Sequence, residues 1–366
     1  MFFVPLFQRL EQSFQIEFSV LVPTDPSLVA WDPRVTTFDV PAGFAYEGQM
    51  HKKMFRSPFK ALSWILAYLK NCERMTLELC RVQKPDVIWV HWLMPSGIVA
   101  YRASRKTGIP YMLASHGTDI FLLRKYPLLY QFFKRVTRSA AQWSVVSRAM
   151  AAIVRTFEAN VTPVIRPLGY NDKVFIEHTE VKRDPNLIIA AGSIIRRKNF
   201  DIVIAAVALL RAKGIPVRLV VLGEGPEKDR LIAQQQLLKA SAYVEILPAC
   251  TQEQLAVWFS RARAFVMPSV DEGLGMVYIE AMACGCPGIG VRQDGTVDVI
   301  QHRANGLLVE TPDTEQVAGA IEEIHRDSAL WESLHRAALT SVSRFASLAI
   351  ENIGNDLRSC ASTVKR

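Results

Sequence analysis

Residues 267–287 read MPSVDEGLGMVYIEAMACGCP, and this stretch decides the fold. An apolar run from Ala264 to Met267 is broken by Pro268 and followed by a loop that contains two glycines. Beyond the loop, apolar residues recur at the spacing of a helix, at positions 276, 279, 282 and 283. The pattern predicts a strand, a loop and a helix. Glycines let backbone approach a ligand closely, and the free amides of a helix's first turn favour an anion such as a diphosphate.

Two carboxylates lie in this stretch, Glu272 in the loop and Glu280 in the expected helix. Because they cannot share one helical face, we expect them to touch two parts of one extended ligand, with Glu280 accepting from vicinal hydroxyls such as those of a ribose. Two other interpretations stay open. The pair could be the acid and the nucleophile of a glycosidase, whose carboxylates lie about 5 to 10 Å apart. Both could also be ordinary solvated charges.

From residue 186 onward, apolar runs typical of strands alternate with segments of helical period. The expected strands are Leu187–Ala191, Val217–Leu222, Tyr243–Leu247, Ala264–Met267, Pro287–Gly290 and Leu307–Val309. The expected helices are Phe200–Lys213, Pro226–Ala240, Gln252–Ala262, Met276–Cys284 and Thr314–His325. Such alternation builds a parallel sheet with helices on both faces, and its ligand site lies at the carboxyl ends of the strands.

The first half of the chain repeats the theme less regularly. The expected strands are Gln15–Val22, Val87–His91, Tyr111–Ser115 and Gln142–Val146, and the expected helices are Lys60–Leu79, Ser96–Thr107, Tyr126–Arg138 and Ser147–Phe157. The segment Ile165–Phe175 contains a Pro and a Gly and shows no hydrophobic periodicity. We therefore expect the connection between two domains just after it.

The spacing of Glu272, seven residues, Glu280 and then Ala-Met-Ala-Xaa-Gly-Xaa-Pro resembles the donor-binding signature of retaining glycosyltransferases of family 4. Further stretches that resemble the family, in its order, are Ala191–Lys198, Val220–Pro226 and Asn305–Val309. The resemblance implies an α/β protein of the GT-B fold, in which two Rossmann-like doubly wound domains face a central cleft. It predicts an N-terminal acceptor-side domain over residues 1–178, a nucleotide-sugar domain over 179–342, and a final helix within 343–366 that crosses back.

The resemblance also implies the activity. We expect a metal-independent, cofactor-free transfer of a sugar from a nucleotide-diphosphate sugar to a glycan or lipid-linked acceptor, with retention of configuration. The catalytic residues implied are His116, Lys198 and Glu272; those implied in substrate binding are Arg197, Gly273, Leu274, Gly275, Met276 and Glu280.

Each implied role has a physical basis and an alternative. Lys198 supplies positive charge where charge develops on the leaving diphosphate. The family's second cation, an arginine directly after the glycine, is replaced here by Ser193, so Arg196 or Arg197 takes that place. An Arg-Arg-Lys surface loop is the competing interpretation. His116 follows a strand end and can donate to a sugar hydroxyl while neutral, although a lone histidine more often has a structural role.

Composition limits the number of domains and the class of protein further. The chain has 366 residues, half of them hydrophobic, which is too long for one typical core and favours two domains. The sequence has neither a long apolar run nor a secretory leader pattern, so we expect a cytoplasmic protein. Six scattered cysteines without a Cys-Xaa-Xaa-Cys pair agree with reduced thiols and no metal site.

The charge is unevenly placed. Residues 1–178 carry 22 Lys and Arg against 13 Asp and Glu, while residues 179–366 carry 21 against 22. Basic and aromatic residues mix at His51–Leu66 and at Arg124–Arg135. Such mixtures suit an anionic membrane surface, which would make the protein peripheral on the inner membrane, or a phosphate-bearing acceptor. Amphipathic helices with solvated basic faces explain them equally well. We expect no nucleic acid partner, because no binding module accompanies the charge.

One departure from the family concerns the N-terminus, where members usually open with a strand and a glycine-rich loop. This chain has no glycine before Gly43, so either Phe2–Val4 is a shortened first strand or that element is missing. The departure motivates a second hypothesis, a noncatalytic GT-B protein that binds a nucleotide sugar or a partner glycosyltransferase. A sugar epimerase or phosphorylase of the same architecture is a weaker third. A dinucleotide-dependent enzyme fits poorly, since the Gly-Xaa-Gly-Xaa-Xaa-Gly motif is absent.

Overall fold

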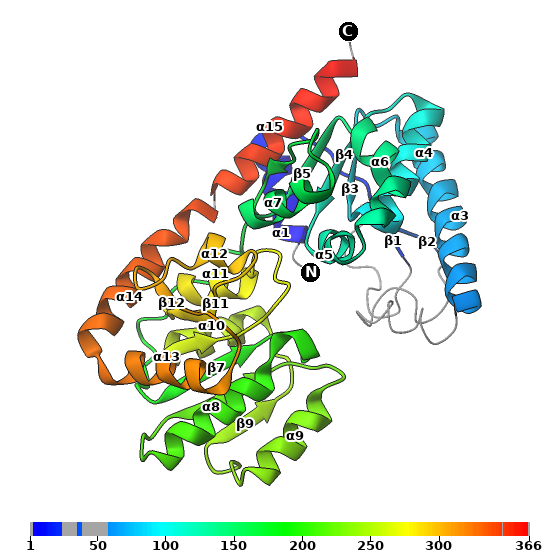
Figure 1. Ribbon diagram of the computed structural model, residues 1–366. Helices are drawn as coiled ribbons and strands as arrows, with labels where there is room; N and C mark the ends of the chain where they lie inside the picture. The colour runs from blue at the N-terminus through cyan, green and yellow to red at the C-terminus, as the bar shows by residue number, and fades with distance from the viewer. Residues whose placement is uncertain (1–2, 24–34, 39–57, 346, 365–366) are drawn as a thin grey trace.

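The computed structural model describes residues 3–23, 35–38, 58–345 and 347–364, which form two α/β lobes (Figure 1). In the C-terminal lobe six parallel strands pair in the order β12-β11-β10-β7-β8-β9. These strands are β7 (Leu187–Ala191), β8 (Arg218–Leu222), β9 (Val244–Leu247), β10 (Ala264–Val266), β11 (Gly288–Val291) and β12 (Gly306–Val309). The order reverses between β7 and β10, and in doubly wound sheets this switch point is where ligands bind.

Helices cover both faces of this sheet, because each strand is followed by a segment of helical period. They are α8 (Phe200–Ala212), α9 (Lys228–Leu237), α10 (Gln252–Arg261), α11 (Met276–Ala283), α12 (Thr296–Val299), α13 (Thr314–Arg326) and α14 (Ser328–Ser341), with the 3₁₀ turns η4 (Arg196–Lys198) and η5 (Ser343–Phe345). All five residues of β7 are buried, as expected of a central strand covered on both sides.

The N-terminal lobe has a four-stranded parallel sheet, β3-β4-β5-β6, and a separate parallel pair, β1-β2. Its strands are β1 (Val20–Pro23), β2 (Val35–Phe38), β3 (Ile88–His91), β4 (Tyr111–Ser115), β5 (Gln142–Val145) and β6 (Val164–Ile165). Its helices are α1 (Phe3–Phe14), α3 (Pro58–Gln83), α4 (Ile98–Thr107), α5 (Thr118–Lys125), α6 (Tyr130–Ser139) and α7 (Arg148–Phe157), with the short π-helix η2 (Leu93–Gly97) and the 3₁₀ turn η3 (Pro127–Leu129).

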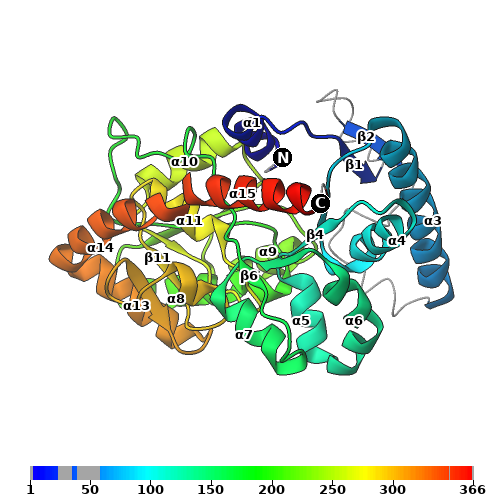
Figure 2. The ribbon, with the colours of Figure 1, turned by 90° about the horizontal axis from the view of Figure 1, so that it is seen from above.

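The last helix, α15 (Ser347–Val364), lies beside α1 and reaches the N-terminal sheet, as the view from above shows (Figure 2). Ile353 and Leu357 pack with Leu10 and Met112 in a small apolar cluster. The Asp356 carboxylate accepts from the Arg166 guanidinium, with 2.9 Å between Oδ1 and the nearer terminal nitrogen. Helix α15 is therefore attached to the first lobe. The domain boundaries at residues 178 and 342 stay a prediction.

The strand expected at Gln15–Val22 is only partly present, because residues 15–19 are irregular and the extended segment is β1, Val20–Pro23. Of the two alternatives for the first residues, the shortened strand is wrong, because residues 3 and 4 lie in helix α1. The physical reason is visible in the packing, since Leu10 and Phe14 lie one helical turn apart and both contact the α15 cluster.

The sequence analysis does not predict the helices α1, α5, α12 and α14. The basic stretch His51–Arg56 lies outside the described residues. No described helix is both long enough and apolar enough to span a bilayer.

Candidate active site

The loops after β7 and β10 meet at the carboxyl edge of the C-terminal sheet, because these two strands are neighbours with Ile188 opposite Ala264. Lys198 ends the 3₁₀ turn that follows β7, and Glu272 lies in the loop between β10 and α11. The ammonium nitrogen of Lys198 is 2.7 Å from Glu272 Oε2. The switch point thus brings together two of the three residues that the resemblance implies in catalysis.

This ion pair is largely withdrawn from water, with the Lys198 and Glu272 side chains 9% and 13% exposed. Burial lowers the pKa of Lys198, and the charge of Glu272 offsets this only in part. Burial would raise the pKa of Glu272, but the positive charges of Lys198 and Arg197 hold it below its ordinary value. A desolvated ammonium interacts more strongly with a nearby anion than one in bulk water does.

Arg197 provides a second positive charge at the same carboxylate. One terminal nitrogen of its guanidinium donates to Glu272 Oε2 at 3.4 Å and to the Asp271 carbonyl at 3.1 Å. Arg196, the other candidate, is exposed. The hydroxyl of Ser269 also donates to Glu272 Oε2, at 3.0 Å. Sequence reasoning missed this serine, although its place three residues before the glutamate in a tight loop could have suggested it.

The glycine loop leads directly into α11. Gly275 has φ 83°, in the left-handed region that favours glycine, and it forms the N-cap of the helix, which begins at Met276. Leu274 is buried beneath the loop. A Cβ at Gly273 would overlap the carbonyl oxygen of His116, which belongs to the other lobe. The predicted substrate-binding residues 273–276 therefore lie together where the two lobes touch.

His116 follows β4 of the N-terminal lobe and contacts a second histidine. Its Nε2 lies 2.7 Å from Nδ1 of His91, which ends β3, and the two rings are stacked with their centroids 4.9 Å apart. The Trp92 ring approaches His116 edge-on at 5.4 Å. The contact with His116 gives His91 a defined partner.

Burial disfavours the charged form of both histidines. It lowers the pKa of His91 far below its usual range, and the neighbouring His116 adds to this. Burial also lowers the pKa of His116, although the charge of Asp119 opposes the shift. At the 2.7 Å contact one ring nitrogen must donate and the other accept, so the tautomers of the two histidines are coupled.

A cation from the first lobe holds the loops of the second. Arg124, on α5, pairs with Asp294 at 2.7 Å and also with Asp271, the residue before Glu272. A second ion pair joins the lobes at Arg148 and Asp298, 2.8 Å apart. The sequence alone does not disclose such pairs, because their partners are about 150 or more positions apart.

Glu280 lies on α11, one turn after the helix begins, and no other described residue forms an ion pair or a side-chain hydrogen bond with it in the structure. Desolvation raises its pKa from 4.5 to about 7. A desolvated carboxyl group without a partner lowers the free energy of unfolding once it ionises. Such a group suits a ligand that supplies hydrogen-bond donors, as two adjacent hydroxyls do.

We expect Glu280→Gln to be more stable than the unchanged chain at about pH 8, by up to about 3 kcal/mol. The folded-state pKa near 7 exceeds the ordinary 4.5, so the unchanged chain loses stability as pH rises between these values. The advantage of the variant should therefore vanish near pH 4.5. Urea unfolding at both ends of this range measures it. Glu245→Gln, at an exposed position of β9, is the control and should show no such difference.

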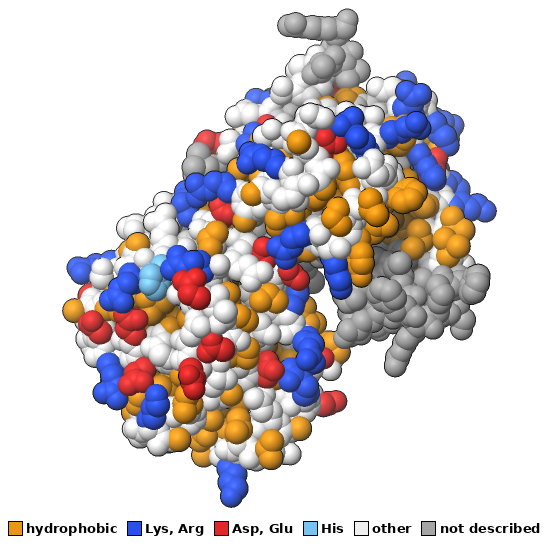
Figure 3. All heavy atoms as spheres, in the orientation of Figure 1, with side chains coloured by type: hydrophobic (Ala, Val, Ile, Leu, Met, Phe, Trp, Pro, Cys, Tyr) orange, Lys and Arg blue, Asp and Glu red, His pale blue; other side chains and the backbone are white. Residues whose placement is uncertain are grey.

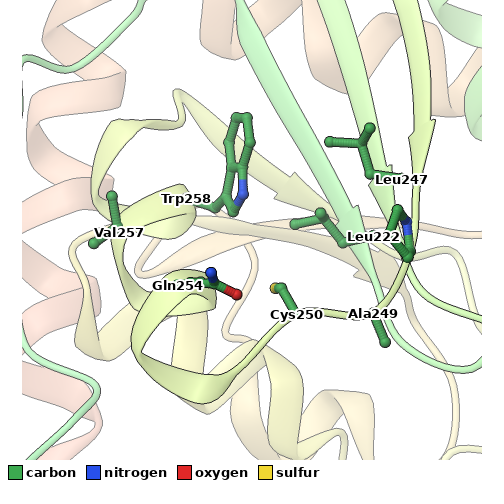
Figure 4. Close-up of a pocket in the computed structure, with 8 residues that line it drawn as sticks. Leu222, Leu247, Ala249, Cys250, Gln254, Val257 and Trp258 are labelled. Carbon is green, nitrogen blue, oxygen red and sulfur yellow. The ribbon is translucent and has the colours of Figure 1, made fainter.

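A pocket of about 400 Å³ opens beside the ends of β8 and β9 (Figure 4). Its lining comprises Leu222, Leu247, Pro248, Ala249, Cys250, Gln254, Val257 and Trp258. The indole of Trp258 and the side chain of Leu222 give it apolar walls. Residues 247–249, at the end of β9 and just beyond it, therefore form one side of a largely apolar pocket.

Among the described residues, no three His, Cys, Asp or Glu side chains gather in a way that could hold a metal ion. Lys198 and Arg197 both place positive charge at the Glu272 carboxylate.

Comparison with known proteins identifies the family. The model for glycosyl transferases group 1 matches residues 172–340, and that for the glycosyl transferase 4-like domain matches residues 11–169. The D-inositol 3-phosphate glycosyltransferase of Pseudarthrobacter chlorophenolicus is 33% identical over 314 residues, covering 75% of this chain and 73% of that protein. The lipopolysaccharide core biosynthesis glycosyltransferase LpsE of Rhizobium meliloti is 28% identical over 280 residues, covering 75% of each.

The fold agrees with that of solved glycosyltransferases. The crystal structure of Anabaena HepE in complex with UDP and glucose superposes with a TM-score of 0.70 at 16% identity, over 89% of this chain and 86% of that one. The α/β fold of two Rossmann-like lobes predicted from the sequence is thereby confirmed. The chain belongs to the group 1 glycosyltransferases, with a 4-like N-terminal domain and the GT-B fold.

Proposed function

We propose that this glycosyltransferase moves a sugar from a nucleotide-diphosphate sugar to a hydroxyl of a glycan or lipid-linked acceptor, with retention of configuration and without a metal ion. The observation that carries the proposal is the desolvated Lys198–Glu272 pair at the switch point, beside the start of α11. A site with two cations and free helix-end amides suits a diphosphate that gains charge as it leaves.

In this proposal the donor lies across the carboxyl edge of the C-terminal sheet. Its base occupies the pocket at residues 247–249, and its ribose hydroxyls donate to Glu280. The diphosphate faces Lys198, Arg197 and the first turn of α11. The HepE structure, solved with UDP and glucose, supports a uridine nucleotide as the first donor to test.

The sugar lies where the lobes meet. Glu272 and the amides of Gly273, Leu274 and Gly275 hold its hydroxyls, and His116 approaches it from the first lobe. The bond between the anomeric carbon and the diphosphate oxygen breaks, and a bond from that carbon to the acceptor oxygen forms on the same face. The acceptor's proton passes to the departing phosphate oxygen. Lys198 and Arg197 stabilise the charge that this oxygen carries before the proton arrives.

The acceptor belongs to the N-terminal lobe, and we place the enzyme in the cytoplasm, at the inner face of the membrane. The excess of basic residues in the first half of the chain suits an anionic acceptor or surface. The name of the LpsE relative supports a glycan acceptor, and that of the inositol phosphate enzyme supports a smaller phosphorylated one. Both kinds belong in the assay.

A panel of nucleotide sugars tests donor binding through thermal stabilisation, because a ligand that binds only the folded form raises the melting temperature. We expect one base and sugar to stand out, and the same compound to be hydrolysed or transferred. Glu272→Ala should abolish that turnover. If no nucleotide sugar shifts the melting temperature, the proposed donor site is refuted.

One observation favours the noncatalytic alternative: the strand Val20–Pro23 is followed by a segment without glycine up to Gly43, whereas family members have a glycine-rich loop after their first strand. The same panel separates the two hypotheses. Stabilisation by a nucleotide sugar without hydrolysis or transfer to any acceptor would identify a binding protein.

A further inference from the structure

An exposed apolar surface covers the turn between α5 and α6 in the N-terminal lobe. It consists of Leu122, Tyr126, Leu128, Leu129 and Phe132, and we call it the η3 face after the short turn at its centre. The Leu128 side chain is 83% exposed and that of Phe132 79% exposed. Hydrophobic side chains gather over α5 and α6 in the space-filling view (Figure 3). Single exposed apolar residues are ordinary, whereas a group of this size marks a binding surface.

The two most exposed side chains of the η3 face project in one direction. Leu128 and Phe132 are four residues apart, so they project from the same side of the helical segment. Beneath them Tyr130 and Val136 are buried in the core, which holds the segment firmly. A rigid helical ridge that presents a leucine and a phenylalanine outward can enter an apolar phase without rearranging the lobe.

Basic residues outnumber acidic ones in the stretch of chain that forms this ridge. Between Asp86 and Glu158 the sequence has ten Lys and Arg residues and one acidic residue, the buried Asp119. Five of the ten cations pair with carboxylates elsewhere, namely Arg102, Lys106, Arg124, Arg138 and Arg148. Within the part of the chain that the structure describes, no carboxylate pairs with Lys125, Lys134 or Arg135. The positive charge around the η3 face therefore stays available to an external anion.

We propose that the η3 face inserts into an anionic lipid bilayer, with Leu128 and Phe132 among the acyl chains and Lys125, Lys134 and Arg135 against the headgroups. The charge of the surface favours a bilayer over a protein partner. Exposed apolar side chains flanked by Lys125, Lys134 and Arg135 match an apolar layer beneath anionic headgroups. Tyr126 stands between the two zones, where amphipathic rings are favoured. Long basic side chains reach the headgroups while their stems stay in apolar surroundings.

The η3 face adjoins the cleft through α5. This helix begins directly after His116 and Gly117, and its Arg124 pairs with Asp271 and Asp294 of the other lobe. Insertion of the neighbouring turn therefore holds the edge of the cleft close to the lipid surface. A lipid-linked acceptor would then reach the site without leaving the bilayer, and this last step rests on the proposed function.

Vesicle co-sedimentation of the full chain tests the insertion without any donor or acceptor. We expect binding to vesicles of one third phosphatidylglycerol in phosphatidylcholine, at least about tenfold tighter than to phosphatidylcholine alone, and weaker binding in high salt. The double variant Leu128→Ser, Phe132→Ser should bind about tenfold more weakly or worse. Leu237→Ser, at an equally exposed leucine (82%) on α9 of the other lobe, is the matched control and should bind like the unchanged chain.

Other outcomes overturn the proposal. Equal binding by the unchanged chain and the double variant, or no binding to anionic vesicles, would refute insertion. So would a concentration-dependent dimer in sedimentation velocity that the double variant abolishes, because the η3 face would then bind a second copy. Transfer to a water-soluble acceptor should be the same for both proteins. Absence of transfer by both proteins would count against the proposed function and leave the vesicle result standing.

Discussion

Lys198→Ala should lower the rate of sugar transfer by about 10²- to 10³-fold, the usual effect of removing one group that stabilises charge in a transition state. The ammonium lies in a desolvated position, 2.7 Å from Glu272. Lys198 belongs to the turn after β7, the strand that pairs with β10, and the loop after β10 leads into α11. The charge it balances grows as the diphosphate leaves, so the loss should appear mainly in kcat and less in KM. Steady-state kinetics with the donor found in the thermal screen measures both.

The same substitution should destabilise the fold by roughly 1–3 kcal/mol, because it leaves the Glu272 carboxylate buried with fewer partners. Ser269 and Arg197 remain to limit this cost. Lys228→Ala is the matched control: its ion pair with Glu224 has the same 2.7 Å separation but is more exposed. It should change stability by less than about 1 kcal/mol and leave turnover intact. A Lys198 variant that keeps a tenth or more of the activity would show that this charge is not used.

Gly273→Ala should reduce transfer at least about hundredfold while both lobes stay folded, because misplacing reacting groups by about an ångström has effects of this order. The added methyl group would overlap the carbonyl oxygen of His116 across the lobe interface. Neither lobe's core contains this contact, so the lobes must move apart to relieve it. Binding of the nucleotide, whose proposed contacts all lie on the C-terminal lobe, should change little. Calorimetry with the free nucleotide and a transfer assay separate the two effects.

Gly319→Ala provides the control for the loss of a glycine. A Cβ there meets nothing within 4 Å, and the residue lies in helix α13. Alanine should stabilise that helix by about 0.5–1 kcal/mol without any effect on turnover. Full transfer activity in Gly273→Ala would mean that the lobes do not need to meet at this glycine during the reaction.

The sequence predicted the C-terminal lobe well because its strands are central. β7 runs from Leu187 to Ala191 as expected, and each of the other five strands lies within one or two residues of its predicted bounds. Strands buried on both faces read as unbroken apolar runs, and the glycines and prolines between them mark the loops. The same logic placed Lys198 and Glu272 at one edge, since neighbouring parallel strands end on the same side.

The N-terminal lobe was harder to predict for a physical reason. The strand expected at Gln15–Val22 is mostly irregular, and helix α1 packs against α15, which lies more than three hundred residues away in the sequence. Amphipathic helices that depend on tertiary packing leave a weak local signal. Contacts such as Arg124 with Asp294, or His91 with His116, arise from topology and so lie beyond any local pattern.

The chain passes between the lobes twice, once between β6 and β7 and again between α14 and α15. Both crossings leave the contacts between the lobes to be made or broken as a group. We expect any rotation that parts the lobes to separate His116 from Gly273 and Arg124 from Asp271 and Asp294 in the same movement.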